Sequence, residues 1–161
     1  MKLAIYAGTF DPVTNGHLDV LFRAARLFDT VVIAVAPNAG KNPLFSLAER
    51  MDLIRESVAG RERILVETFD GLLVDYARAR GAVALIRGLR VVSDFEYEFQ
   101  MTQMNRELQP EMETIFFMPS QQYTFTSSTI VKQVALFDPG RIANYVPLHV
   151  AAALNKRFGH C

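Results

Sequence analysis

The sequence predicts an α/β protein: a Rossmann-like, doubly wound sheet of five parallel strands, with helices on both faces and a short helical C-terminus. Two observations support this fold class. Apolar runs alternate along the chain with helical segments, which is the pattern of strand–helix–strand units joined by right-handed crossovers. The apolar runs are also continuous rather than alternating, as expected of parallel strands that are covered on both faces.

The expected strands are short apolar runs separated by helical patterns and by turn residues. They are predicted at residues 2–7, 31–36, 64–68, 83–86 and 114–118. No internal repeat, low-complexity tract or linker interrupts the alternation. Residues 1–161 are therefore expected to form a single domain.

The helices are predicted from apolar periodicity and from capping residues. The first, at 18–28, has the i, i+3, i+4 and i+7 spacing of one helix face at Leu21, Ala24, Ala25 and Phe28. Ser46 followed by Glu49 is the pattern of a capping box, so the second helix is expected to begin at 46. Helices are predicted at 46–58, 72–80, 93–108 and 127–136, with two short helices after the Asp138-Pro139-Gly140 break, the last from Pro147.

Composition excludes several classes of function. The chain holds 17 basic and 17 acidic residues, and this zero formal net charge argues against a broad nucleic-acid surface but leaves room for a focused anion site. Cys161 is the only cysteine, so no disulfide framework or zinc site is expected within the chain. Asp11 and Pro12 interrupt any signal-peptide core, and no apolar run reaches about 18 residues. We therefore expect a cytoplasmic protein without nucleic-acid or membrane partners.

Several loops are expected to meet at one edge of the sheet. Ligands of doubly wound sheets bind at the carboxyl ends of the strands, near the point where the strand order reverses. The loops after the first, second, fourth and fifth strands end there. They carry Thr9 and His17, then Lys41, then Arg87 and Arg90, then the segment 123–129. This convergence predicts a binding site.

The loop between the first strand and the first helix is suited to phosphate. It contains Gly8 and Gly16, and a glycine-bearing loop before a helix presents free N–H groups and the positive end of the helix dipole. His17, in the first helical turn, can point at the same anion. The alternatives are that Thr9 is only a turn hydroxyl and that His17 is an ordinary exposed helix residue.

The basic residues of the other loops admit two interpretations. Lys41 lies on a long loop and is either a phosphate ligand or a solvated surface lysine. Arg87 and Arg90 leave the same buried strand and indicate focused anion binding, because guanidinium groups bind phosphate bidentately. Their alternative is a pair of salt bridges at the rim, with Asp94 or Glu96.

Three segments in order carry a family resemblance. GTFDP followed by TNGH, at residues 8–17, resembles the T/H-x-G-H signature of a nucleotidyltransferase superfamily. Together with IRGLR at 86–90 and DFEYE at 94–98, it is similar to the bacterial type of phosphopantetheine adenylyltransferase. The match runs from about residue 2 to about residue 158. Ala7 departs from the Pro that is common in the family, a change that affects loop stiffness more than chemistry.

The resemblance implies roles for individual residues. As catalytic residues it implies His17, Lys41 and Arg87. As residues that bind the acceptor it implies Thr9, Lys41, Leu73 and Arg87. As residues that bind ATP it implies Thr9, Phe10, His17, Gly88, Leu89, Arg90, Glu98, Tyr123, Thr124, Phe125, Thr126, Ser127, Ser128 and Thr129. It also implies Mg²⁺ that arrives with ATP, without a metal ligand from the protein.

Simpler interpretations accompany some of these assignments. Glu98 belongs to an acidic run that is also typical of a solvated helix face, and the residues alone do not favour it over Glu96. The hydroxyls of 127–129 are equally typical of a helix N-cap, and Leu73 of core packing. The apolar residues of 95–108 cover more than one helix face, which indicates burial on several sides, as in an oligomer. The resemblance implies a homohexamer.

The implied reaction is adenylyl transfer from ATP to 4′-phosphopantetheine, which gives dephospho-coenzyme A and pyrophosphate in coenzyme A biosynthesis. The acceptor phosphate would attack the α-phosphorus in line. Two alternatives remain open: a related adenylyltransferase for another phosphate such as nicotinamide mononucleotide, and a nucleotide-binding sensor without turnover. No G-x-G-x-x-G or G-x-x-x-x-G-K-[ST] motif is present, which argues against a dinucleotide dehydrogenase or a P-loop kinase.

Overall fold

The computed structural model describes residues 1–37 and 42–159, and it contains the predicted five-stranded parallel sheet. The strand order is β3-β2-β1-β4-β5, with every neighbouring pair parallel. The strands are β1 (Leu3–Gly8), β2 (Thr30–Val35), β3 (Ile64–Thr68), β4 (Ala84–Gly88) and β5 (Glu113–Phe117). The strand order reverses at β1, whose neighbours are β2 and β4. The fold class expected from the sequence is confirmed.

Side chains of the central strands alternate between two apolar cores, one on each face of the sheet. Tyr6, Ile33 and Ile86 pack in one core with residues from α1, α2, α5 and α6. Ile5 and Leu85 pack in the other, with Val74 and Ala77 of α3. Both faces are therefore covered, which explains why the strands read as continuous apolar runs.

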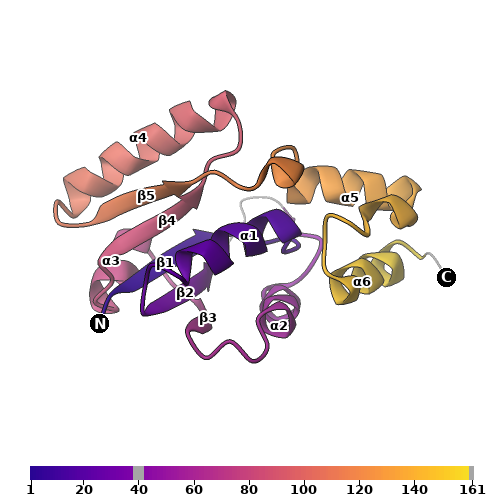
Figure 1. Ribbon diagram of the computed structural model, residues 1–161, viewed down its shortest axis with the longest axis horizontal. Helices are drawn as coiled ribbons and strands as arrows, with labels where there is room; N and C mark the ends of the chain where they lie inside the picture. The colour runs from indigo at the N-terminus through magenta and orange to yellow at the C-terminus, as the bar shows by residue number, and fades with distance from the viewer. Residues whose placement is uncertain (38–41, 160–161) are drawn as a thin grey trace.

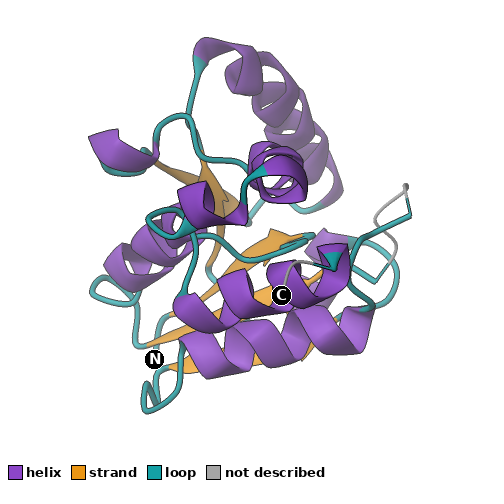
Figure 2. Cartoon of the chain, turned by 90° about the vertical axis from the view of Figure 1, so that its right-hand side faces the viewer, coloured by secondary structure: helices purple, strands orange, loops and turns teal. Residues whose placement is uncertain are grey.

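The helices follow the sequence pattern closely. They are α1 (Asn15–Ala24), α2 (Leu47–Ser57), α3 (Leu73–Ala79), α4 (Val92–Leu108), α5 (Ser128–Phe137) and α6 (Leu148–Phe158). Two 3₁₀ turns, η1 (Gln121–Tyr123) and η2 (Pro139–Ile142), flank α5, and η2 stands where the first of two short helices was expected. Figure 1 shows α5 and α6 on the side of the molecule toward which the strands run, and Figure 2 looks at the molecule from that side.

The predicted bounds of the first helix, 18–28, are wrong at both ends. The helix begins at Asn15 because Thr14 caps it, and it ends at Ala24 in a series of turns. Phe28 is nevertheless buried, so it keeps the apolar spacing without being helical. The capping box predicted from Ser46 and Glu49 is present at the start of α2.

Helix α4 lies at the outer end of the sheet beside β5 (Figure 1). It carries exposed apolar side chains along its length: Phe95, Tyr97, Phe99, Met104 and Leu108. The wide apolar surface expected of this helix is therefore present and uncovered in the single chain. Within the described residues, no helix is both long and apolar enough to cross a membrane.

Candidate active site

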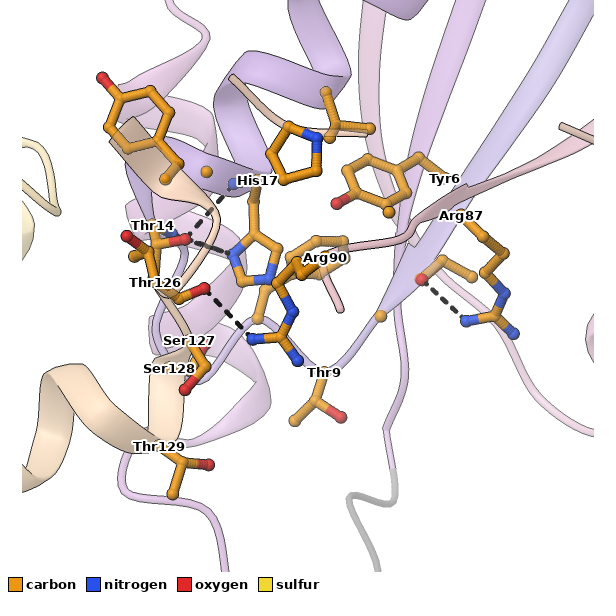
Figure 3. Close-up of a pocket in the computed structure, with 18 of the residues that line it drawn as sticks. Tyr6, Thr9, Thr14, His17, Arg87, Arg90, Thr126, Ser127, Ser128 and Thr129 are labelled. Atoms are coloured by element: carbon orange, nitrogen blue, oxygen red, sulfur yellow. Dashed lines mark hydrogen bonds between the residues drawn. The ribbon is translucent and has the colours of Figure 1, made fainter. Parts of the chain in front are cut away.

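A cavity of about 290 Å³ opens at the carboxyl ends of β1 and β4, beside the start of α1 (Figure 3). Segments that are far apart in sequence meet in it, as the sequence predicted. Its predicted lining residues are Gly8, Thr9, Phe10, Gly16, His17, Arg87, Gly88, Arg90, Glu98, Tyr123, Thr126, Ser127, Ser128 and Thr129. The same cavity is lined by residues for which the sequence predicted no binding role: Tyr6, Ala7, Thr14, Val20 and Pro119.

His17 is held in one tautomer by the cap of its own helix. It is the third residue of α1, where its Nδ1 accepts the backbone N–H of Thr14 at 3.1 Å, while the Thr14 hydroxyl accepts the N–H of His17. A ring nitrogen that accepts an N–H carries no proton, so the proton of the neutral ring lies on Nε2. The ring lies between Thr14 and Arg90 in Figure 3. Nε2 is therefore a hydrogen-bond donor available to the cavity.

The surroundings of His17 keep the ring neutral. Burial, together with the nearby charge of Arg90, lowers the pKa of His17 to about 4. Near neutral pH the side chain is then a donor without a charge, rather than an acid with a proton to lose. The alternative of an ordinary exposed helix residue is excluded, because the ring faces the cavity and is packed against Phe10.

The turn after β1 is tightly packed around Phe10. Phe10 has a φ of 50°, a left-handed conformation that costs on the order of 1–3 kcal/mol for a non-glycine residue. Its ring lies edge-on to that of His17, with the centroids 5.1 Å apart. A Cβ at Gly8 would lie 3.0 Å from the Phe10 ring, so a larger residue there would have to displace the ring. Thr9, which lies between Gly8 and Phe10, faces the cavity.

Arg87 and Glu98 form an ion pair at the cavity wall. The Nε of Arg87 lies 3.4 Å from the Oε2 of Glu98, and both side chains are mostly buried. Glu98 Oε2 is itself fully buried and makes no hydrogen bond within the described residues. Of the two carboxylates between which the sequence did not choose, Glu98 lines the cavity and Glu96 does not.

Arg90 combines the two interpretations that the sequence left open. It lines the cavity and donates to the Thr126 carbonyl at 3.2 Å. It also forms the expected salt bridge with Asp94, at 3.1 Å. Because one carboxylate and one carbonyl hold the guanidinium in place, Arg90 brings a fixed positive charge beside His17.

The segment 123–129 contributes hydroxyls at the start of α5. Ser127 is the N-cap and accepts the N–H of Ile130 at 3.1 Å, so the capping interpretation is confirmed, and the same residue also lines the cavity. Ser128 donates to the Pro12 carbonyl at 2.8 Å, which ties α5 to the turn after β1. The buried hydroxyl of Thr126 has no hydrogen-bond partner among the described residues.

Some predicted site residues do not line this cavity, and their roles stay predictions. Leu73 packs against the core on the α3 side of the sheet. Phe125 is 79% exposed. The N–H of Leu89 bonds the carbonyl of Phe117 on the neighbouring strand β5, and the N–H of Thr124 bonds the carbonyl of Gln121 in a turn. Lys41 lies outside the described residues.

No protein metal site accompanies the cavity in the described part of the chain. Groups of three or more His, Cys, Asp or Glu side chains that could hold a metal ion are absent from residues 1–37 and 42–159. The cavity offers the Glu98 carboxylate, which already faces Arg87. A metal that enters with a phosphate ligand would meet one carboxylate in this cavity, that of Glu98.

Comparisons of the sequence with known proteins identify the relatives of this chain. The model of the family described as cytidylyltransferase-like matches residues 5–134. The chain is 50% identical over 157 residues to the phosphopantetheine adenylyltransferase of Alkaliphilus metalliredigens, which covers 98% of this chain and 99% of that protein. It is 52% identical over 155 residues to the phosphopantetheine adenylyltransferase of Methylococcus capsulatus, covering 96% and 95% of the two chains.

The chain belongs to the phosphopantetheine adenylyltransferase family. The resemblance drawn from GTFDP, TNGH, IRGLR and DFEYE is thereby confirmed.

Solved structures agree with the fold of this family. A putative nicotinate-nucleotide adenylyltransferase from Vibrio parahaemolyticus superposes with a TM-score of 0.69 at 15% identity, covering 96% of this chain and 99% of that one. A bifunctional NMN adenylyltransferase/ADP ribose pyrophosphatase from Francisella tularensis gives a TM-score of 0.69 at 19% identity, covering 96% of this chain and 49% of that one. At such identities these similarities establish the fold alone.

The family motif has a physical basis in this chain. Thr14 of the TNGH segment caps α1 and fixes the tautomer of His17, a role that sequence reasoning missed although the capping pattern was a usable signal. A Cβ at Gly16 would lie 3.4 Å from the Cβ of Tyr123, at the lower end of ordinary contact distances. The phosphopantetheine adenylyltransferase motif thus sets the tautomer of one donor of the site.

Proposed function

We propose that this chain transfers the adenylyl group of ATP to 4′-phosphopantetheine, giving dephospho-coenzyme A and pyrophosphate. The observation that carries the proposal is the meeting of the His17 Nε2–H group with Arg87 and Arg90 in one cavity at the carboxyl ends of the strands. The curated relatives that are about half identical over nearly their full length carry the name of this activity.

The proposed chemistry is in-line attack of the acceptor phosphate on the α-phosphorus of ATP. A phosphate monoester has a second pKa of about 6 and is already a dianion near neutral pH, so the step needs no general base. The bond between the α-phosphorus and the bridging oxygen to the β-phosphorus breaks, and pyrophosphate leaves. Catalysis then rests on positioning and on stabilising the charge that develops on the α-phosphate.

His17 is proposed as the donor to that developing charge. Its Nε2–H is available because Nδ1 accepts the N–H of Thr14. Its lowered pKa keeps the ring neutral, so His17 donates this hydrogen bond without adding a second positive charge beside Arg90. A fixed donor needs little reorganisation during the reaction, which is why preorganised donors contribute strongly to catalysis. Arg90, beside the ring, adds positive potential.

The remaining predicted residues divide between the two substrates. Thr9, Lys41, Leu73 and Arg87 are proposed to hold the acceptor. Phe10, Gly88, Leu89, Arg90, Glu98 and residues 123–129 are proposed to hold ATP, together with Thr9 and His17. The Arg87–Glu98 pair supports this division, because an acceptor phosphate can replace Glu98 as the partner of Arg87 while Glu98 turns to the nucleotide. The unpartnered Thr126 hydroxyl and Glu98 oxygen are consistent with polar ligand groups in this cavity.

Mg²⁺ is proposed to enter with ATP and to neutralise part of the triphosphate charge. Arg90 and the N–H groups at the start of α5 would also stabilise the negative charge of the triphosphate. A cytoplasmic setting, where ATP is abundant, belongs to the same proposal.

A homohexamer is also part of the proposal. The exposed apolar side chains of α4 are a surface that a second copy of the chain can cover. Such contacts would remove from water the apolar side chains that cover a wide part of the helix surface in the single chain.

Product mass is the test that separates this function from its alternatives. The protein is incubated with MgATP and either 4′-phosphopantetheine or nicotinamide mononucleotide, and products are identified by mass while pyrophosphate release is followed. We expect dephospho-coenzyme A with the first acceptor and no adenylylated product with the second. Adenylylation of the mononucleotide alone would favour the related transferase, and ATP binding without pyrophosphate release would favour the sensor.

A further inference from the structure

Arg50 of α2 is a buried cation whose hydrogen bonds to the described residues all go to main-chain carbonyls. Its side chain is 1% exposed. The guanidinium donates to the carbonyls of Thr9 at 2.7 Å, Ala36 at 3.0 Å, Phe45 at 3.2 Å and Pro37 at 3.5 Å. Arg50 therefore joins the turn after β1, the exit of β2 and the start of α2.

A cation in such a place is costly unless its partners are fixed. Burying a charge is unfavourable without pairing and hydrogen bonds, and an apolar residue of similar size often serves stability better. Arg50 has no salt bridge within the described residues. What the guanidinium supplies instead is a rigid fork of donors that holds several carbonyls at set distances.

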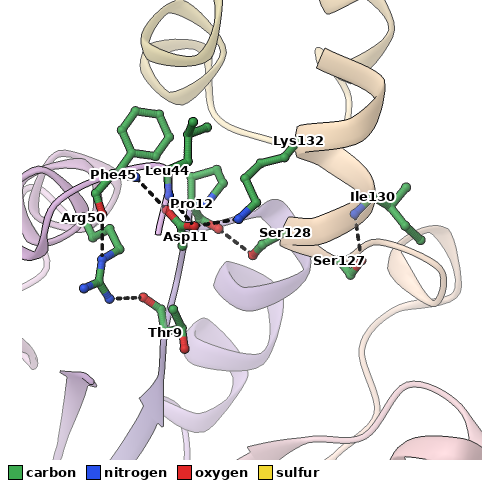
Figure 4. A network of polar contacts seen from close by, with 10 residues as sticks. All are labelled: Thr9, Asp11, Pro12, Leu44, Phe45, Arg50, Ser127, Ser128, Ile130 and Lys132. Carbon is green, nitrogen blue, oxygen red and sulfur yellow. Dashed lines mark hydrogen bonds and ion pairs between the residues drawn. The ribbon is translucent and has the colours of Figure 1, made fainter. Parts of the chain in front are cut away.

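Asp11 completes the connection from the other side (Figure 4). Its carboxylate accepts the N–H groups of Leu44 and Phe45, each at 2.9 Å, and pairs with Lys132 of α5 at 2.6 Å. Phe45 thus binds Asp11 through its N–H and Arg50 through its carbonyl. We call this set of contacts, made by Arg50, Asp11 and Phe45, the Phe45 clamp.

The clamp encloses the strained residue Phe10. Arg50 holds the residue before it, Thr9, and Asp11 is the residue after it. A left-handed conformation at a bulky residue persists only where its surroundings determine it. The conformation places the Phe10 ring against His17, at 5.1 Å between centroids, and leaves Thr9 facing the cavity.

We propose that Arg50 is a positioning residue for the adenylyl transfer: through the Thr9 carbonyl it holds the turn after β1 so that Phe10 supports His17 in its reactive place. The inference rests on the proposed function, and it extends that function to a residue outside the cavity. Misplacement of a catalytic group by about 1 Å can lower a rate about 100-fold. The loss of the hydrogen bond between Arg50 and the Thr9 carbonyl should therefore have a measurable effect on turnover, although Arg50 lies outside the cavity.

The test compares Arg50→Gln and Arg50→Lys with Arg157→Met. Arg157 of α6 lies over the ring of the same Phe45, at 5.3 Å, and its removal takes a cation from that neighbourhood without touching Thr9. Circular dichroism checks folding at the assay temperature. Steady-state kinetics then gives kcat and both KM values, and the ring signals of His17 in ¹H–¹³C spectra report its contact with Phe10.

We expect kcat of Arg50→Gln to fall about 10–100-fold, in line with a misplaced group, with the His17 signals shifted. Arg50→Lys should recover part of the loss, because a lysine keeps the charge but not the fork, and Arg157→Met should match the wild type. Wild-type kcat and unshifted His17 signals in both Arg50 variants would overturn the proposal. Unfolding of both would also count against it, since Arg50 would then hold the whole fold. If the wild type itself shows no turnover, the proposed function fails, and the His17 signals alone decide the role of Arg50.

Discussion

His17 Nδ1 accepts the backbone N–H of Thr14 at 3.1 Å, and this single contact decides which nitrogen of the ring faces the cavity with a proton. The His17 side chain therefore both completes the capping box of α1 and supplies the donor of the site. The spacing of Thr14 and His17 in TNGH follows from this relationship. A capping box joins the residue that precedes the helix, here Thr14, to the third residue of the helix, here His17.

The His17 ring should stay neutral through the physiological range. Because burial and Arg90 lower its pKa, we expect its ring signals in an NMR titration to move with a midpoint at about pH 4. Its tautomer signals should show the proton on Nε2 above that pH. A midpoint near the usual value of about 6.5 would contradict this environment.

The same shift predicts a loss of stability in acid. The folded pKa lies below the unfolded value, so the unfolded chain binds more protons and stability falls as pH decreases from about 6.5 to about 4. The contribution of His17 is complete above pH 6.5 and amounts to about 3 kcal/mol at most. Urea unfolding at pH 7 and pH 4.5 measures it.

The matched variant for this experiment is His17→Gln, since glutamine at the same position can also complete a capping box. Asp11 adds to the acid sensitivity of both proteins. Burial would raise the pKa of Asp11, but hydrogen bonds from Lys132, Leu44 and Phe45 bring it below the usual value. The difference between wild type and His17→Gln therefore isolates His17, and an equal loss in both would refute its contribution.

The two arginines should affect different substrates. Arg87→Ala is expected to raise mainly the KM for phosphopantetheine, and Arg90→Ala mainly the KM for ATP. A charge-assisted hydrogen bond contributes roughly 1.5–3 kcal/mol, so each effect should be about 10–100-fold. Lysine in either place should recover only part, because the bidentate fork is lost.

Arg106→Ala is the control for that pair, because Arg106 lies at the far end of α4 and bonds Glu113 on the surface. Steady-state kinetics with each substrate varied in turn gives the comparison. If Arg87→Ala and Arg90→Ala impair the same substrate, the division between acceptor and nucleotide is wrong.

The exposed face of α4 predicts an assembly larger than a dimer. Light scattering at micromolar concentration should show it, and Tyr97→Asp combined with Met104→Asp should reduce its size, because both side chains are exposed and apolar in the single chain. Leu27→Asp, an exposed leucine after α1, is the control. A monomeric wild type, or an assembly that the α4 changes leave intact, would exclude this surface as the interface.

The sequence was informative where local rules decide structure. The strands, the cap at Ser46 and the convergence of the loops followed from apolar runs and turn residues. The end of α1 did not, because Phe28 is buried from a turn and so continues the helical spacing. Periodicity reports which side chains are buried, and it does not report whether their backbone is helical.

Pairings between distant residues could not be predicted from the chain alone. Arg87 and Glu98 lie on a strand and a helix, and their contact depends on how α4 lies over the sheet. Arg50 looks like one more polar residue of an amphipathic helix, yet it is buried and bonds Thr9 far away in sequence. Such contacts are set by tertiary packing, for which spacing carries no signal.

Turnover of wild type and His17→Ala with MgATP and 4′-phosphopantetheine, followed as dephospho-coenzyme A by mass, tests directly whether His17 serves the proposed adenylyl transfer. His149→Ala, on α6, is the control for loss of a histidine that bonds Leu53 and Ser57 away from the cavity. We predict product from the wild type and the control, and a kcat about 10²–10³ lower for His17→Ala with ATP affinity nearly unchanged. Absence of product from the wild type, or near-wild-type turnover of His17→Ala, would contradict the account.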